Sequence, residues 1–158
     1  MDNNISTIKI NASAKENRIA EILDSVRAIY ASTERFDAKV ATALEVDRSG
    51  LRAINAMHLG PVSPGHLGQV LGLASGSVTA LLDRLEAGGH IERVISKTDR
   101  RRRDARLTIT TRQRAGALYG KLGESIENGF SVKTNAEIKR AADTINQVAN
   151  AFDEAARA

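Results

Sequence analysis

Hydrophobic residues near both ends of the chain recur at alternating intervals of three and four positions. Near the N-terminus the series comprises Ile19, Ile22, Val26, Ile29, Thr33, Phe36 and Val40. Near the C-terminus it comprises Ile138, Ala141, Ile145, Val148, Phe152 and Ala155. This spacing predicts two long amphipathic helices with narrow apolar stripes. The capping-box sequences Ser13–Glu16 and Thr134–Glu137 predict where these helices begin.

The sequence of the middle of the chain predicts three shorter helices. Asp47 is expected to cap the first, and Ser63, followed by Pro64 at the first helical position, is expected to cap the second. Ser75 is expected to cap the third. The apolar face of this third helix comprises Val78, Leu81, Leu82 and Leu85. Two short helices joined by a tight turn, 63–71 and 75–87, are typical of a helix-turn-helix.

The hydrophobic period then changes from helical to extended. Residues 91–96 contain three β-branched apolar residues, Ile91, Val94 and Ile95, which is enough for a strand, and residues 104–109 alternate between apolar and polar positions, so both are predicted strands. The charged segment 97–103 joins them as the turn of a hairpin. A further helix is expected to begin at Thr108 or Thr110 and to run to about Gly129. The predicted fold is mainly α-helical with one small β-hairpin.

Composition and charge narrow the function. The chain has 158 residues, of which 42% are hydrophobic and 27% charged, as in a single globular domain. It has no cysteine, which excludes thiolate metal sites and thiol chemistry. It has no apolar run long enough for a membrane span, and its first ten residues do not resemble a signal peptide, so a cytoplasmic protein is expected.

The basic residues are concentrated in the hairpin region. Nine of the 23 basic residues but only three of the 19 acidic residues lie within 91–114. This segment therefore carries a net charge of +6, whereas the rest of the chain carries −2. Four consecutive arginines occupy the turn: Arg100, Arg101, Arg102 and Arg103. Such a local patch indicates a site for a polyanion.

The order of these elements favours duplex DNA as the polyanion. The outer face of helix 75–87 carries Ser77, Thr79, Ala80, Asp83 and Arg84, and Ser75 lies at its N-terminal end. The candidate DNA contacts among them are Ser75, Ser77, Thr79, Ala80 and Arg84. Small hydroxyl side chains let a helix approach the edges of bases in the major groove. A basic hairpin that follows a helix-turn-helix is typical of a wing, whose arginines can enter a narrow minor groove.

Several sequence blocks resemble the MarR family of bacterial transcription regulators. They are Leu81–Glu86, Gly88–Arg93, Asp99–Arg101, Leu107–Thr108 and the run Leu73–Thr79. The resemblance implies a homodimeric winged helix-turn-helix protein that binds pseudo-palindromic DNA, commonly as a repressor relieved by a small molecule. It implies one domain in which 47–110 form the DNA-binding lobe, and 13–45 and 112–158 form the dimerisation helices.

The resemblance also implies roles for single residues. Asp99 and Arg101 match an Asp-x-Arg pair that stiffens the wing in the family, although four arginines here leave open which one lies at the tip. An effector pocket is expected between the terminal helices and the lobe. Its candidate residues are Tyr30, Phe36, Ala53, Met57 and His58. We expect no cofactor and no metal, since the spacing of His58 and His66 fits no standard ligand motif.

Two other functions remain open at this level. The arginine cluster would equally serve an architectural protein that coats DNA without sequence preference. A protein-interaction module derived from the same fold is a third interpretation, which the dense basic wing disfavours. No set of residues suggests an enzyme, because the chain has neither a glycine-rich phosphate loop nor a nucleophile-elbow motif.

Overall fold

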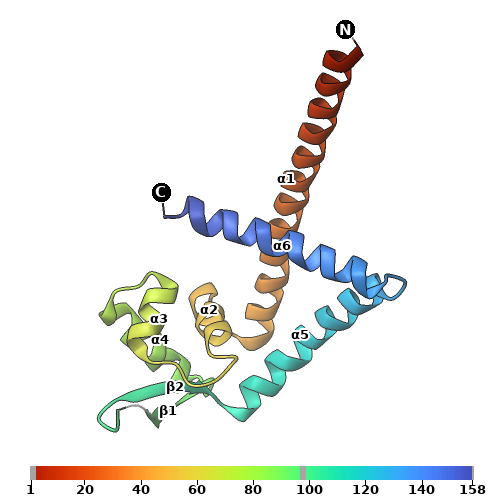
Figure 1. Cartoon of the computed structure of the whole chain (residues 1–158). Coiled ribbons are helices and arrows are strands. Elements are labelled where there is room, and N and C mark those ends of the chain that lie inside the picture. Colours follow the sequence, from red (N-terminus) through yellow and green to blue (C-terminus); the bar gives the residue numbers. More distant parts are fainter. Residues whose placement is uncertain (1–2, 97–98, 158) are drawn as a thin grey trace. The chain divides into compact units, whose positions relative to one another are not determined.

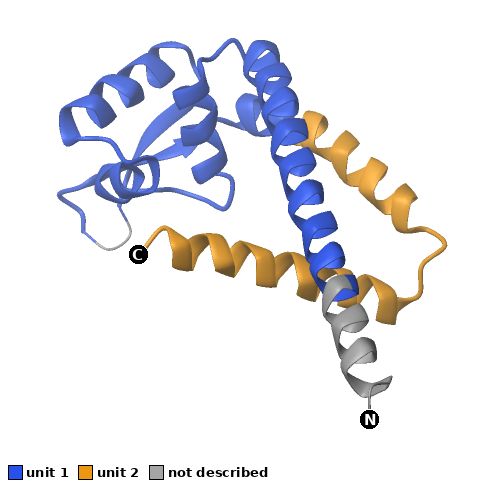
Figure 2. Ribbon diagram, turned by 90° about the horizontal axis from the view of Figure 1, so that it is seen from above, with its two compact units in different colours: residues 1–115 blue, residues 116–158 orange. Residues whose placement is uncertain are grey.

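The computed structural model describes residues 3–96 and 99–157, with side chains from Ala14 onward, and contains six helices and one hairpin in these residues (Figure 1). Their order is α1 Asn3–Leu44, α2 Arg48–Ala56, α3 Pro64–Leu71, α4 Ser75–Ala87, β1 Ile91–Ile95, β2 Arg103–Leu107, α5 Ile109–Phe130 and α6 Asn135–Ala155. The chain divides into two compact units, residues 1–115 and 116–158 (Figure 2). The predicted fold class, mainly helical with one small hairpin, is confirmed.

Helix α1 is longer than the sequence predicts. It is already helical at Asn3, so the prediction that Ser13 begins it is wrong. The segment 3–44 contains neither glycine nor proline, and nothing in it interrupts helical hydrogen bonding before the Ser13 motif. The helix ends where Glu45 adopts the left-handed conformation, with φ of 60°. Val40 and Leu44, in its last turns, are buried.

Helices α2, α3 and α4 pack together into the core of the first unit. The side chains of this core that are at most 2% exposed include Leu51, Ile54, Met57, Leu67, Val78 and Leu82. Two predicted caps are confirmed. Asp47 accepts a hydrogen bond from the Gly50 amide at 2.6 Å, and Ser63 accepts one from the His66 amide at 3.2 Å. The first two helices of the lobe therefore begin where the sequence predicts.

The start of α4 differs from the prediction by one residue. Ser75 is the first helical residue, and Ala74 occupies the cap position without a side-chain hydrogen bond. The Ser75 hydroxyl is therefore not the cap; its backbone carbonyl instead accepts a hydrogen bond from the Thr79 hydroxyl at 3.1 Å. The predicted apolar face of α4 is confirmed, because its four residues are at most 3% exposed.

Strands β1 and β2 form an antiparallel hairpin, in a register that runs from Ile91 opposite Leu107 to Ile95 opposite Arg103. The loop before α3 adds an isolated bridge, in which Val62 and Ala105 exchange two backbone hydrogen bonds. The predicted strands are confirmed with slightly different bounds. Ile109, however, belongs to α5 and is 75% exposed, so the predicted alternation ends at Leu107. Residues 97 and 98 of the predicted turn lie outside the described residues.

The starts of the last two helices follow from their caps. The Thr108 hydroxyl accepts a hydrogen bond from the Thr111 amide at 3.3 Å, so Thr108, rather than Thr110, precedes α5. In α6 the predicted capping box is confirmed, with Thr134 and Glu137 bonding reciprocally. Among residues 3–96 and 99–157, no helix is long and apolar enough to cross a membrane.

Candidate nucleic-acid interface

The turn between α3 and α4, which makes these helices a helix-turn-helix, depends on two glycines. Gly72 adopts a left-handed conformation with φ of 69°, which a residue with a side chain would adopt only under strain. Gly68 lies so close to the next segment that an added Cβ would stand 3.1 Å from the Leu73 carbonyl oxygen. The Leu73 amide also donates a hydrogen bond to the Gly68 carbonyl at 2.9 Å. These two glycines therefore let α4 follow α3 closely.

The outer face of α4 presents small polar groups to solvent. Its exposed residues include all five that the sequence assigns to DNA: Ser75, Ser77, Thr79, Ala80 and Arg84. Ser75 and Thr79 also line a groove of about 500 Å³ between α3 and α4, together with Pro64 and Gln69. The N-terminal half of α4 is therefore exposed, and two of its hydroxyl residues stand at the edge of this groove.

Arg84 lies further along α4 than the hydroxyl residues and is paired within the lobe. Its guanidinium is 3.0 Å from the carboxylate of Asp47, which also caps α2. It lies in the last turn of the helix, whereas Ser75, Ser77 and Thr79 lie in its first half. The three hydroxyl residues therefore share the N-terminal half of α4, with Ser75 and Thr79 one turn apart at the groove, whereas Arg84 is held in an ion pair within the lobe.

The two acidic residues on α4 are held by an arginine of the hairpin. Arg93 pairs with both Asp83 and Glu86. Because these ion pairs offset the negative charge on the helix surface, they reduce repulsion between α4 and a phosphate backbone. They also join β1 to α4. Pairs between residues far apart in the sequence could not be predicted from spacing alone.

Asp99 closes the tip of the hairpin. Its carboxylate accepts a hydrogen bond from the Arg101 amide at 2.9 Å, and its carbonyl accepts one from the Arg102 amide at 2.9 Å. Arg103 lies in β2 opposite Ile95, so Arg100 and Arg101 occupy the turn itself. Asp99 thus orders the tip through the backbone of Arg101 and not through its guanidinium in the described residues.

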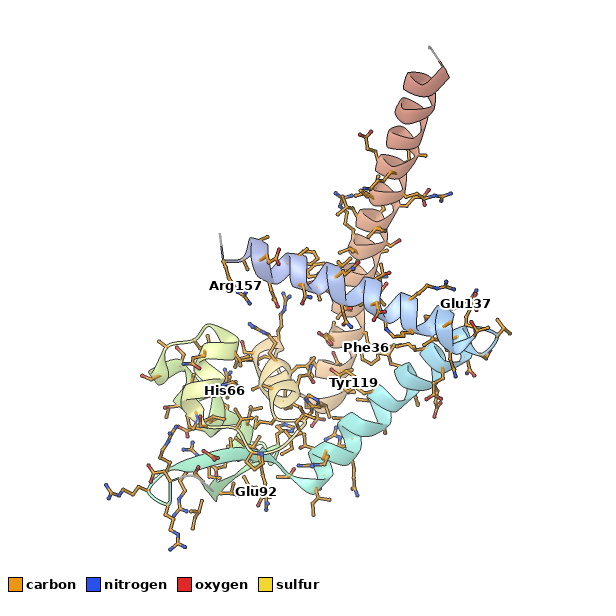
Figure 3. All side chains as sticks on the ribbon, in the orientation of Figure 1. Phe36, His66, Glu92, Tyr119, Glu137 and Arg157 are labelled. Carbon is orange, nitrogen blue, oxygen red and sulfur yellow. The ribbon has the colours of Figure 1, made fainter. Side chains whose placement is uncertain are left out.

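The tip of the hairpin is the most basic exposed surface of the unit. All four arginines at 100–103 are exposed, and none pairs with a carboxylate in the part of the chain that the structure describes. Figure 3 shows nitrogen-tipped side chains extending from this end of the hairpin. Nearer its base, Arg106 pairs with Glu92 at 2.9 Å. Uncompensated cations therefore gather at the tip, which is the arrangement that attracts phosphates.

The residues assigned to an effector pocket are scattered. Ala53 and Met57 are fully buried in the lobe core, whereas Tyr30 is 62% exposed on α1. His58 is exposed, and its Nδ1 lies 2.7 Å from the Asn55 carbonyl. The effector assignment stays a prediction. Among residues 3–96 and 99–157, no group of three His, Asp or Glu side chains is placed to bind a metal.

The structure also contains a groove edged by charged residues, which the sequence does not indicate. It has a volume of about 580 Å³ and lies where α1 meets α2. Its lining residues are Glu34, Asp37, Ala38, Ala41, Arg48, Leu51 and Arg52. Arg48 pairs with Glu34 across it at 2.8 Å. The regular spacing on α1 places its residues on one face, but which neighbour that face meets depends on the turn at Glu45.

Comparisons with known proteins decide the family. The model of the MarR family matches residues 44–102. An uncharacterized HTH-type transcriptional regulator of Bacillus subtilis (strain 168), YcgE, is 30% identical over 129 residues, which cover 81% of this chain and 84% of that protein. The chain belongs to the MarR family. Members of this family are transcription regulators and not enzymes.

Solved structures share the fold of this MarR-family chain. A MarR family protein from Bacillus stearothermophilus has a TM-score of 0.68 at 19% identity, covering 87% of this chain and 97% of that one. A mutant of MepR from S. aureus, bound to an oligodeoxyribonucleotide, has a TM-score of 0.54 at 16% identity, covering 80% and 94%. At these identities the likeness concerns the fold, and it confirms the winged helix-turn-helix.

Proposed function

We propose that this MarR-family regulator is a cytoplasmic homodimer that binds a pseudo-palindromic site in duplex DNA, as a repressor relieved by a small molecule. The observation that carries the proposal is the pairing of two exposed surfaces in one unit. The first is the exposed N-terminal half of α4, which carries Ser75, Ser77 and Thr79, and the second is the uncompensated arginine tip of the hairpin. In this arrangement α4 enters the major groove and the wing contacts the flanking minor groove.

The α4 face would supply sequence preference. Ser75 and Ser77 lie at the N-terminal end of α4, where the helix dipole favours phosphate and the side chains are short enough for close approach. Thr79 and Ala80 lie half a turn to one turn further along and would face base edges, including thymine methyl groups. Arg84 would reach the DNA backbone only if its ion pair with Asp47 opened.

The arginine tip would supply affinity. Arg100 and Arg101, in the ordered turn, are proposed to enter the minor groove, and Arg102 and Arg103 to contact the adjacent phosphates. Asp99 is proposed to hold the tip in this shape. Such contacts release counterions, so binding would weaken steeply with added salt.

Dimerisation is proposed from the apolar stripes of the long helices. In the single chain, Ile19, Ile22 and Ile29 of α1 remain 39–58% exposed, and Ile138, Ile145 and Phe152 of α6 remain 39–61% exposed. Stripes of this kind are stable in water when a second helix covers them. A symmetric dimer would then place its two α4 helices on half-sites about one helical turn, roughly 10 bp, apart.

The experiment that tests the proposal is footprinting of the purified full chain on fragmented genomic DNA of its source organism at physiological salt. Recovery of a few sites that share an inverted repeat supports it. Uniform recovery that vanishes with modest added salt contradicts it and favours an architectural protein, to which the arginine tip would be equally suited. Failure to bind any duplex favours the interaction module.

Two substitutions separate the roles of the surfaces. Arg101→Ala is expected to weaken binding to all sequences and to reduce the salt slope by about one. Thr79→Ala is expected to cost about 1–3 kcal/mol of discrimination between the site and its single-base variants. Arg18→Ala, on an exposed part of α1, is a control with the same change of charge as Arg101→Ala. If Arg101→Ala and Arg18→Ala behave alike, the wing assignment is wrong.

A further inference from the structure

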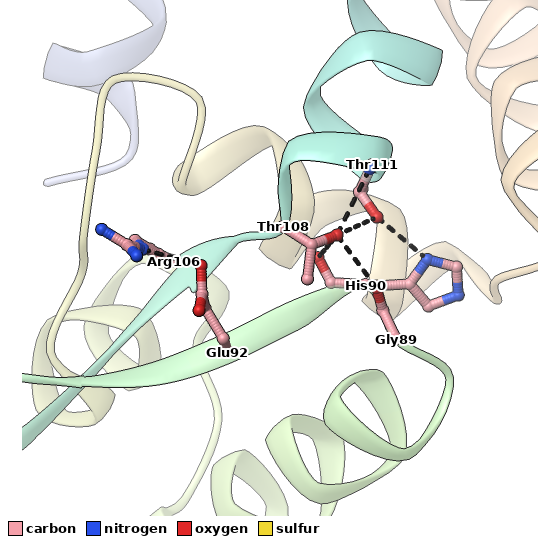
Figure 4. Close-up of polar contacts among 6 residues, drawn as sticks. All are labelled: Gly89, His90, Glu92, Arg106, Thr108 and Thr111. Atoms are coloured by element: carbon pink, nitrogen blue, oxygen red, sulfur yellow. Dashed lines mark hydrogen bonds and ion pairs between the residues drawn. The ribbon is translucent and has the colours of Figure 1, made fainter.

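A buried polar network joins the end of α4, the base of β1 and the first turn of α5 (Figure 4). The chain leaves α4 through Gly89, which adopts a left-handed conformation with φ of 72°. The His90 amide then donates a hydrogen bond to the Leu85 carbonyl of α4 at 2.8 Å. The Gly89–His90 segment is therefore hydrogen-bonded to the recognition helix, so the position of that helix determines where the hairpin begins.

Thr108 connects this segment to α5 in three ways. Its amide donates to the His90 carbonyl at 3.0 Å, and its hydroxyl donates to the Gly89 carbonyl at 2.9 Å. The same hydroxyl oxygen accepts a hydrogen bond from the Thr111 amide of α5 at 3.3 Å. A helix cap needs only the accepting role. The donation to Gly89 is an additional bond that capping does not explain.

Thr111 and His90 extend the connection into the core. Thr111 is 3% exposed and His90 9% exposed. The Thr111 hydroxyl oxygen lies 3.1 Å from the Thr108 hydroxyl and 3.5 Å from His90 Nδ1. Because the proton of Thr108 is donated to Gly89, the Thr111 hydroxyl can donate to Thr108 or to His90. Both arrangements keep the first turn of α5 bonded to the base of the hairpin.

A second contact ties the same part of α5 to the end of α1. The guanidinium of Arg114 donates to the Ala43 carbonyl. This carbonyl lies in the last turn of α1, where carbonyls lack partners within the helix. The first two turns of α5 are therefore bonded both to the peptide that follows the recognition helix and to the end of α1. From there α5 continues without a break to Phe130.

We propose that Thr108 is a positioning residue, whose hydroxyl sets the orientation of α4 relative to the first turn of α5. This inference rests on the proposed function, in which α5 and the other long helices hold two lobes together on two half-sites. The angle between α4 and α5 then determines the separation of the two recognition helices. Through its donated hydrogen bond, Thr108 would select the half-site spacing that the dimer binds.

Three substitutions at Thr108 separate this role from capping. Thr108→Ser keeps both the donated and the accepted hydrogen bond. Thr108→Asp keeps an acceptor for the Thr111 amide, as aspartate is a strong cap, but cannot donate to Gly89. Thr108→Val removes both. The full chain of each variant is compared on duplexes that carry the same two half-sites, at the wild-type spacing and at spacings changed by one or two base pairs.

The wild-type protein and Thr108→Ser are expected to prefer one spacing by about tenfold, as for the loss of one specific base contact. In Thr108→Asp the preference is expected to fall to within about threefold, with binding to an isolated half-site within about twofold of wild type. Thr111→Val, which leaves every backbone donor in place, is a second variant should Thr108→Asp not fold. It is expected to reduce the preference in the same direction.

The outcomes distinguish this inference from the proposed function. If the wild-type protein prefers one spacing and both Thr108→Asp and Thr111→Val keep the full preference, Thr108 serves only to cap α5 and the inference is overturned. If the wild-type protein shows no preference for two half-sites at any spacing, the proposed function itself fails. Loss of preference in Thr108→Asp with retention in Thr108→Ser supports the inference.

Discussion

The winged helix-turn-helix lobe and the long helices have similar hydrophobic patterns but opposite degrees of burial. In the lobe, the apolar faces of α2, α3 and α4 meet one another, and residues such as Ile54, Leu67 and Leu82 are at most 2% exposed. Helix α6 has no buried residue, and Ile145 and Phe152 are 58% and 61% exposed. The core of the lobe is therefore closed within one chain, whereas the apolar stripes of the long helices stay exposed in it, as the proposed dimer requires.

The largest expected effect tests whether the core of the lobe is stabilised within one chain. Ile54→Ala is expected to lower the free energy of unfolding by about 2–5 kcal/mol, because it removes buried methyl groups and leaves a cavity among α2, α3 and α4. The loss should be independent of protein concentration when urea unfolding of the lobe is followed, because no second chain covers Ile54. A loss that disappears at high protein concentration would mean that the lobe, too, depends on association.

The next largest effect tests whether the apolar stripes of the long helices form an interface between two chains. The double substitution Ile145→Glu and Phe152→Glu is expected to raise the dissociation constant of the dimer by at least about a hundredfold, because each change occurs twice in a symmetric interface and places charges on apolar surface. Sedimentation equilibrium measures the constant. Leu59→Glu is the matched control, since Leu59 is 88% exposed in the lobe and outside the stripes.

If Leu59→Glu dissociates the dimer as strongly as the double substitution, the stripes are not the interface. If neither change alters the dissociation constant, the exposed apolar residues of α6 serve another partner, and the comparison between the two regions would have to be revised.

Local chemistry makes much of the lobe predictable from sequence. Asp47, Ser63 and the apolar face of α4 form contacts within a few residues along the chain, and helix periodicity and capping report such contacts directly. The cap prediction for Ser75 is wrong because the residue before it can also take the extended conformation of a cap, and no side chain competes there. The prediction for the start of α1 is wrong because a capping sequence begins a helix only where the preceding residues are not already helical.

The features that could not be predicted all depend on how one element packs against another. In the sequence Arg84 resembles a free cation on the helix surface, but Asp47, 37 residues away, pairs with it. The double attachment of Arg93 to Asp83 and Glu86 depends on how β1 returns past α4. The groove at α1 and α2 lies beside the turn at Glu45, whose left-handed conformation ends α1. Periodicity identifies faces, but tertiary structure determines what each face meets.

The smallest effect concerns how α6 maintains its helix without a core. The Thr134 hydroxyl accepts a hydrogen bond from the Glu137 amide at 3.3 Å, and the Glu137 carboxylate accepts one from the Thr134 amide at 2.8 Å. Thr134→Ala is expected to cost about 1 kcal/mol of helix stability, which lowers the protection of the first-turn amides against hydrogen exchange about fivefold. The measurement is made in the Ile145→Glu, Phe152→Glu background, where association does not mask the cap.

The same cap gives a pH dependence of known sign. The backbone amide of Thr134, and then its hydroxyl, hold the pKa of the Glu137 carboxyl below its ordinary value of 4.5. A carboxyl with a lowered pKa in the folded state stabilises that state above its ordinary pKa, and this contribution is lost as the pH falls through the folded value. The protection of α6 should therefore be constant above about pH 5 and decline below about pH 4.5.

Glu137→Gln should remove the decline while keeping most of the protection at neutral pH, because glutamine can also complete a capping box. An equal decline in Glu137→Gln would show that another acid, and not the capping carboxylate, governs the pH dependence of the helix.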